Sequence, residues 1–61
     1  MNESLLVDER EAAAIIGLKP RMLRDVRRRG EIEFVRVGRM IRYRREALEQ
    51  FVDRMRVPAR S

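Results

Sequence analysis

The chain of 61 residues contains no cysteine, no histidine and no tryptophan, and only three aromatic residues. Without cysteine it can form neither a disulfide nor a thiolate metal site. Without histidine it lacks the commonest general base and the commonest metal ligand of proteins. A chain of this length makes one small domain with a thin core and little room for a substrate pocket. We therefore expect neither an enzyme nor a protein that holds a metal or a cofactor.

Lysine is almost absent as well, because Lys19 stands alone beside fourteen arginines. The formal net charge of +5 is distributed unevenly along the chain. Residues 1–18 carry a net charge of −3, whereas residues 19–45 carry +8. A GC-rich genome also raises the arginine content, but codon bias alone would not concentrate the charge in the middle of the chain. A segregated block of arginine indicates a polyanionic partner.

Long apolar runs are missing too. No segment approaches the roughly twenty apolar residues of a transmembrane helix. The first four residues, Met1 to Ser4, lack the basic and apolar regions of a signal peptide. We therefore expect a cytoplasmic protein that does not associate with a membrane.

The first half of the chain predicts two short helices. Asp8 suits the N-cap of the first helix, and Glu11 follows three residues later as in a capping box. Alanine and isoleucine then supply an apolar face, and Gly17 suits the end of the helix. Pro20 fits the first position of a second helix, which should stop at Gly30. Two short helices joined by a tight turn with glycine predict a helix-turn-helix.

The next stretch, Phe34–Arg44, alternates apolar residues with arginine, which predicts a two-stranded β-hairpin. A two-residue loop would place Arg36 opposite Ile41. A three-residue loop would pair Arg36 with Arg42 instead. It would also collect the apolar side chains on one face, namely Val35, Val37, Ile41 and Tyr43. Because only the odd-length loop sorts apolar residues from arginines, we expect that loop.

A last helix is expected from about Arg45 to Arg56, since Pro58 prevents its continuation. Its apolar stripe consists of Leu48, Phe51, Val52 and Met55. The predicted fold is therefore α+β, a small winged helix-turn-helix made of a helix-turn-helix, a two-stranded hairpin wing and a C-terminal helix. The domain should span residues 5–57, with flexible tails at residues 1–4 and 58–61.

The second helix should present one face to the core and the other to a partner. At 100° per residue, the core-facing side chains are Met22, Leu23 and Val26. The outward side chains are Arg21, Arg24, Arg28 and Asp25. In a helix-turn-helix this outward face enters the major groove, where arginine makes bidentate bonds to guanine. The alternatives are base contacts, phosphate contacts and a face that is merely solvated. Few acidic neighbours are present to pair with these arginines, which argues against a merely solvated face. For Asp25 we favour pairing with an adjacent arginine over a bond to cytosine.

The predicted hairpin would act as a wing that reaches phosphate or the minor groove. Arg39 at its tip is the best candidate for that contact. Lys19 is a poor helix cap, so either a phosphate contact or a small tolerated loss of stability accounts for it. The complete set of predicted DNA-binding residues is Lys19, Arg21, Arg24, Arg27, Arg28, Arg36, Arg39 and Arg42.

Three stretches of the chain resemble a known family. They are L-L-x-D-E-x-E-A-A-x-I-I-G-L from residue 5, F-V-R-V-G-R-x-I-R-Y from residue 34, and R-E-A-L-E-Q-F from residue 45. In this order they resemble the excisionase-type DNA-binding domain, a small winged helix-turn-helix related to the MerR group. The resemblance implies a phage excisionase, or recombination directionality factor, that binds repeated sites in attachment DNA, bends it and helps an integrase to excise the prophage. Lys19 and Arg24 depart from the family, which often has Ser or Thr and an aromatic residue there.

MerR-type regulators continue into a long dimerising helix, for which a chain that ends at Ser61 has no room. We therefore expect a monomer in solution that associates cooperatively on double-stranded DNA. The apolar stripe of the last helix could contact the integrase, but core packing is our interpretation. A small MerR-like transcriptional regulator is the alternative function. A binding module for an acidic protein and an RNA-binding protein are further alternatives, although Tyr43 and Phe34 are too few aromatics to stack bases.

Overall fold

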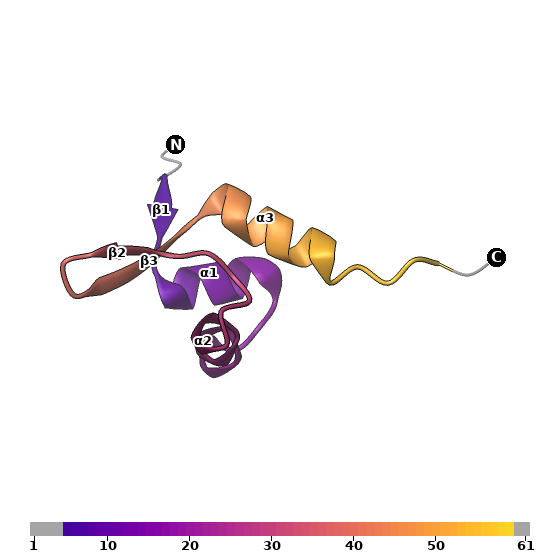
Figure 1. Ribbon diagram of the computed structural model, residues 1–61, viewed down its shortest axis with the longest axis horizontal. Coiled ribbons are helices and arrows are strands. Elements are labelled where there is room, and N and C mark those ends of the chain that lie inside the picture. Colours follow the sequence, from indigo (N-terminus) through magenta and orange to yellow (C-terminus); the bar gives the residue numbers. More distant parts are fainter. Residues whose placement is uncertain (1–4, 60–61) are drawn as a thin grey trace.

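The computed structural model describes residues 5–59, which form three helices and three strands (Figure 1). Their bounds in chain order are β1 Leu6–Val7, α1 Glu9–Ile16, α2 Pro20–Arg28, β2 Val35–Val37, β3 Met40–Arg44 and α3 Arg45–Arg54. This architecture confirms the predicted α+β winged helix-turn-helix and adds one short strand to it. The expected tail at residues 1–4 and the end of the expected C-terminal tail, residues 60–61, lie outside the described residues.

The first helix begins and ends as its sequence predicts. The Asp8 side chain accepts a hydrogen bond of 2.7 Å from the backbone N–H of Glu11, which satisfies a free donor of the first turn. Gly17 ends the helix in the left-handed conformation, with φ of 77°. The buried face consists of Ala12 and Ala13. Small side chains on this face let α2 pack closely against α1.

The second helix starts at Pro20, with Lys19 at the N-cap position and no side-chain hydrogen bond to the cap. Leu23 and Val26 are its buried residues. The helix ends as expected before Gly30, whose backbone N–H bonds back to the last turn. Met22 was expected in the core, but it is 49% exposed. It lies at the edge of the apolar face because Leu23 and Val26 set the direction of the core.

The three strands form one antiparallel sheet in the order β1-β3-β2. β1 pairs Val7 with Tyr43 and Leu6 with Arg44. Val7 and Tyr43 are both buried, so this short pairing brings the N-terminal segment into the core. The segment before α1 therefore packs as a third strand of the sheet.

The hairpin corrects the predicted register. Val37 pairs with Met40 and Arg36 with Ile41, so the loop contains two residues, and the predicted three-residue loop is wrong. Gly38 has a φ of 62°, and Arg39 has no positive φ. A positive φ at the first loop residue alone is the pattern of a two-residue type II′ turn, whose twist matches that of the flanking strands. The turn therefore sets the register.

The prediction failed because it assumed that one face of the whole hairpin is buried. Figure 1 shows β2 and β3 extending beyond the helices. Near the tip Val37 and Met40 are both about half exposed, and they lie on the same face of the hairpin as Arg42. Because no core covers this part of the hairpin, burial of apolar residues does not select the register there.

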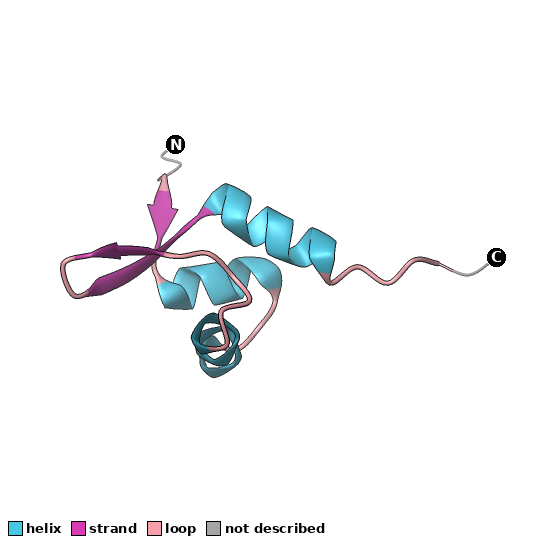
Figure 2. Cartoon of the chain, in the orientation of Figure 1, coloured by secondary structure: helices cyan, strands magenta, loops and turns pink. Residues whose placement is uncertain are grey.

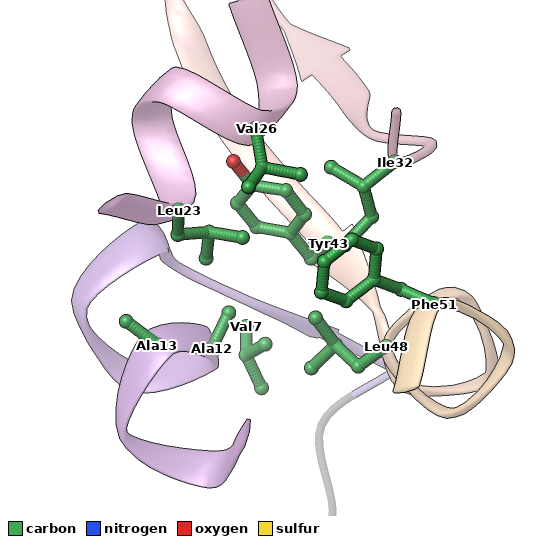
Figure 3. Close-up of a cluster of buried hydrophobic side chains, with 9 residues drawn as sticks. All are labelled: Val7, Ala12, Ala13, Leu23, Val26, Ile32, Tyr43, Leu48 and Phe51. Carbon is green, nitrogen blue, oxygen red and sulfur yellow. The ribbon is translucent and has the colours of Figure 1, made fainter. Parts of the chain in front are cut away.

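The core forms where β1, β3 and α3 pack against the helix-turn-helix (Figure 3). Tyr43 lies at its centre and is completely buried, with its hydroxyl group on the side of Val26. α3 contributes Leu48 and Phe51, as expected. The rest of its predicted stripe is not core, since Val52 is 49% and Met55 53% exposed.

The cartoon in Figure 2 distinguishes the three helices from the strands and loops. In the view of Figure 1, α1 lies between α2 and α3, and the hairpin points away from all three helices. The segment after α3 leaves the body on the side opposite to the hairpin. Within residues 5–59, no helix is long and apolar enough to cross a membrane. The second helix and the hairpin thus form two separate projections of one small body.

Candidate nucleic-acid interface

The outward face of α2 carries three exposed arginines. Arg21, Arg24 and Arg28 are spaced by three and four residues, so they lie along one side of the helix. Leu23 and Val26 lie on the opposite side and hold the helix to the core. The predicted division of α2 into two faces is confirmed at these positions, and contact of the arginines with DNA stays a prediction.

These three arginines have no partners in the part of the chain that the structure describes. None of them takes part in an ion pair or donates a side-chain hydrogen bond there. Arg24 and Arg28 are one turn apart, and like charges at this spacing repel by a few tenths of a kcal/mol. A bound polyanion would remove this repulsion and occupy the free donors of each guanidinium.

Asp25 differs from its predicted role. Pairing with an adjacent arginine was expected; among residues 5–59 Asp25 forms no ion pair, although its charge adds to the raised pKa of Arg29, one turn further along the helix. Asp25 is exposed on the same side of α2 as Arg21 and Arg28. Asp25 therefore offers a hydrogen-bond acceptor on the outward face of α2, where the other outward side chains are donors.

The start of α2 carries an additional cation. Lys19 is exposed at the N-cap position and makes no capping bond. A cation at the positive end of the helix dipole is mildly destabilising. The exposed N-terminus of α2 and Lys19 together form a positive end beside Arg21. This arrangement suits an anion. A stabilising role does not explain why Lys19 stands at this position, since its side chain makes no capping bond.

The tip of the hairpin carries Arg39, which is exposed and without a partner in the described chain. Arg36 is also exposed and lies on the face of the hairpin that carries Ile41. Arg42 lies on the opposite face, paired with Val35, so the predicted shared face of the hairpin arginines is wrong. The Arg42 guanidinium donates to the Ile41 carbonyl at 2.9 Å and contacts the Met40 sulfur at 3.3 Å. Arg42 thus folds back along its own strand.

Arg27 is the predicted DNA-binding residue whose surroundings fit that role least. Its side chain is only 16% exposed. Its Nε donates to the Tyr43 hydroxyl at 3.1 Å, and its Nη2 lies 3.3 Å from the Glu9 carboxylate. The guanidinium carbon also lies 5.5 Å from the centre of the Phe34 ring, within the range of a cation–π contact. This geometry gives Arg27 an internal role and does not support direct contact with DNA.

Other arginines are engaged on the surface. Arg29 pairs with Glu31 through two hydrogen bonds, and this carboxylate raises the pKa of the Arg29 guanidinium. Arg54 donates to the Glu31 carbonyl at 2.6 Å and so links α3 to the segment after α2. Arg44 pairs with Glu46 at 2.7 Å. These contacts leave two separate sets of unpaired arginines among the described residues, one on the outward face of α2 and one at the hairpin tip.

An unpaired arginine is not by itself a sign of a binding site. Arg10 on α1 and Arg56 after α3 are also exposed and without partners among residues 5–59. They differ from the arginines of α2 because neither belongs to a row on one helix face. Within the same residues, no three acidic side chains gather into a possible metal site.

The chain matches the Helix-turn-helix domain family over residues 6–56. It belongs to this family. A search of curated protein sequences found no match. The match covers all six elements, from β1 to the end of α3. For a helix-turn-helix protein, DNA is the implied partner, and α2 holds the position of the second, recognition helix.

Sequence reasoning missed the internal cluster of this helix-turn-helix protein. The sequence indicates Tyr43 as an apolar residue of the hairpin, and it gives no role to Glu9. The residues that meet at Arg27 lie on α1, on β3 and just before β2. Nothing in their spacing along the chain signals this meeting, because it depends on how α1 and the hairpin pack around α2.

Proposed function

We propose that the protein is an excisionase-type DNA-binding protein that inserts α2 into the major groove and rests its hairpin tip on the adjacent backbone or minor groove. In this role it bends double-stranded attachment DNA and directs a phage integrase toward excision. The observation that carries the DNA-binding part is the row of unpaired arginines, Arg21, Arg24 and Arg28, on the outward face of the recognition helix.

The chemistry of these side chains supports contact with a duplex. Arginine presents planar paired donors that match guanine O6 and N7 and also phosphate oxygens. Asp25, in the same row, could accept a bond from cytosine N4. A face with donors and one acceptor can distinguish more base pairs than a face of donors alone, because arginine matches guanine and a carboxylate matches cytosine.

The hairpin supports a second contact. Arg39 lies at the end of a projection that extends beyond the helices, and it has no partner in residues 5–59. Arg36 adds a further exposed cation on β2, close to the two-residue loop. Arginines on a slender projection suit a narrow minor groove, which has an enhanced negative potential.

The excision part of the proposal is supported by the resemblance of the wing and of the start of α3 to excisionase-type domains. Such a role needs several copies bound cooperatively on neighbouring sites, so that the DNA follows a curved path. We propose that the protein is a monomer in solution and associates only on DNA.

DNA binding is tested by selecting sites for the full chain from a random duplex library and measuring affinity against salt concentration. We expect a preferred sequence and a steep loss of affinity with salt. Arg39→Ala should lower the salt slope by about one unit if the tip contacts phosphate. Arg56→Ala is the matched control, since it removes another exposed cation, in the segment that leaves the body on the side opposite to the hairpin. Equal effects of the two variants would argue against a wing contact.

The excision role is tested with the cognate integrase and attachment-site DNA. We expect the protein to stimulate excision, and a fluorescence measurement on end-labelled DNA to report bending. No stimulation, together with repression of a promoter that contains the selected site, would instead identify a small transcriptional regulator. Binding of an acidic protein without any preferred DNA sequence would contradict both functions.

A further inference from the structure

We infer that Arg27 is a positioning residue that fixes the hairpin relative to the recognition helix, and so determines whether both projections reach one DNA duplex together. This inference rests on the proposed function, because it concerns how the two DNA-contacting projections are held. It assigns to Arg27 an action through Tyr43 and Phe34, and no contact with DNA.

The contacts of Arg27 join three parts of the fold. Its guanidinium donates to the Tyr43 hydroxyl of β3 at 3.1 Å and lies over the Phe34 ring, just before β2. The same group pairs with Glu9 in the first turn of α1 at 3.3 Å. Arg27 itself belongs to α2, so one side chain connects the recognition helix to its supporting helix and to the root of the wing.

Few other contacts hold the wing against α2. α2 packs chiefly against α1, whereas β2 and β3 pack on one another and β3 also contacts β1, α1 and α3. Within the core, Leu23 and Val26 touch the cluster that contains Tyr43, but apolar contacts are non-directional. The Arg27 contacts are directional, since a planar fork meets a hydroxyl, a carboxylate and a ring face in fixed orientations. They are therefore suited to set an angle as well as a distance.

The position of Arg27 explains why it does not serve as a further DNA contact. The side chain is 16% exposed and the paired Glu9 side chain 23% exposed, so both charges are largely withdrawn from water. Withdrawal of Arg27 from Glu9 toward DNA would leave a partly buried carboxylate without a partner, which is costly. Arg28, the next residue, is exposed and free of partners in the described chain, and it is available to DNA instead.

Two mild substitutions distinguish a positioning role of Arg27 from a purely stabilising one. Tyr43→Phe removes one hydroxyl group and keeps the ring in the core. Arg27→Lys keeps the charge near Glu9 but loses the planar fork. In both variants a thermal melt of the full chain establishes that the protein is folded before DNA binding is measured on the selected duplex.

The readout is the factor by which Arg39→Ala, a wing substitution, weakens binding in each background. In the unaltered protein this factor should be large, because the wing is held in place. In the Tyr43→Phe and Arg27→Lys backgrounds it should shrink by about two- to tenfold, because a loosely held wing contributes less. The factor for Arg24→Ala, a helix substitution, should stay nearly constant and serves as the control.

An unchanged Arg39→Ala factor in both folded backgrounds would overturn the inference and leave Arg27 a stabilising residue only. If Tyr43→Phe is folded and Arg27→Lys is not, the Arg39→Ala factor in the Tyr43→Phe background alone tests the inference, and an unchanged factor there overturns it. Failure of the proposed function looks different, since the unaltered protein would then show no preferred duplex at all.

Discussion

Arg27 and Arg28 are neighbours with the same charge, and the fold gives them opposite surroundings. Arg27 is held by Glu9 and Tyr43 inside the molecule, whereas Arg28 has no partner among the described residues. The helical angle places Arg28 near the centre of the outward face and Arg27 on its flank, and the packing of α1 and β3 then encloses Arg27. At the scale of single residues, the presence of a partner distinguishes a structural arginine from one available to DNA.

The unpaired arginines of α2 should matter for DNA and little for folding. We expect Arg24→Ala or Arg28→Ala to weaken binding to the selected duplex by about 1–3 kcal/mol if the residue reads a base. The free energy of unfolding should stay nearly unchanged or rise slightly, because repulsion between them is relieved. Binding titrations on selected and scrambled duplexes measure the effect, with Arg56→Ala as control. An equal loss on both duplexes would identify a phosphate contact.

Tyr43 gives the stability a dependence on alkaline pH. Burial raises the pKa of Tyr43 above its ordinary value near 10, and the charge of Glu9 acts in the same direction, while the hydrogen bond from Arg27 opposes it. The folded state therefore holds this proton more tightly than the unfolded state. The stabilisation is complete below pH 10 and is lost as the pH rises through the folded-state pKa. Urea unfolding at several pH values should show this loss, and Tyr43→Phe should reduce it. An equal alkaline loss in Tyr43→Phe would assign the effect to another group.

At the scale of elements, the hairpin shows how a local rule outweighs a global one. The sorting of apolar residues predicted an odd loop, whereas the strands pair across two residues, Gly38 and Arg39. Glycine at the first loop position favours a two-residue turn. The sequence therefore contained the correct signal, but the assumption of a buried hairpin face gave more weight to the weaker one.

Of the two loop residues of the hairpin, Gly38 should tolerate substitution less well. An added Cβ would meet no atom within 4 Å, so space is not the obstacle. Its φ of 62° is the obstacle, and we expect Gly38→Ala to cost about 1–2 kcal/mol. Arg39→Ala, the matched loop substitution without a positive φ, should cost much less. Urea unfolding compares the two, and equal costs would contradict the assigned turn.

The third helix divides its apolar stripe between the core and the surface. Leu48 is buried, whereas Val52 one turn later is half exposed beside Ile15 and Ile16. Leu48→Ala should therefore destabilise the protein by about 2–5 kcal/mol, enough to unfold much of so small a domain. Val52→Ala should cost less than about 1 kcal/mol. Similar costs for the two variants in urea unfolding would show that the whole stripe packs in the core.

For the whole molecule, sequence alone predicted the fold class, the ends of α1, the start of α2 and the helix-turn-helix, whereas α3 ends at Arg54, two residues before the expected Arg56. These depend on local signals such as the Asp8 cap, Gly17 and Pro20, which act within a few residues. The Arg27 cluster and the exposed half of the α3 stripe were not predictable in this way. Both depend on how elements distant in the chain pack together. A chain of 61 residues forms a core too small to cover every apolar stripe.

The charge pattern of the whole molecule fits this division. The basic segment 19–45 contains α2 and the hairpin, while the acidic segment 1–18 contains α1, which supports α2 from inside. Glu9 of the acidic segment neutralises Arg27 of the basic one. The net positive charge is thereby left on the parts of the molecule that project from its core.

The most direct test of DNA contact through α2 and the hairpin is a titration of the isotope-labelled full chain with its selected duplex, followed by nuclear magnetic resonance. We predict that the largest shifts occur at residues 21–28 and 36–39, including the arginine side chains Arg24, Arg28 and Arg39. The exposed face of α3 around Val52 and Met55 should change little. Shifts concentrated on that face of α3, with α2 and the hairpin tip unaffected, would contradict the account.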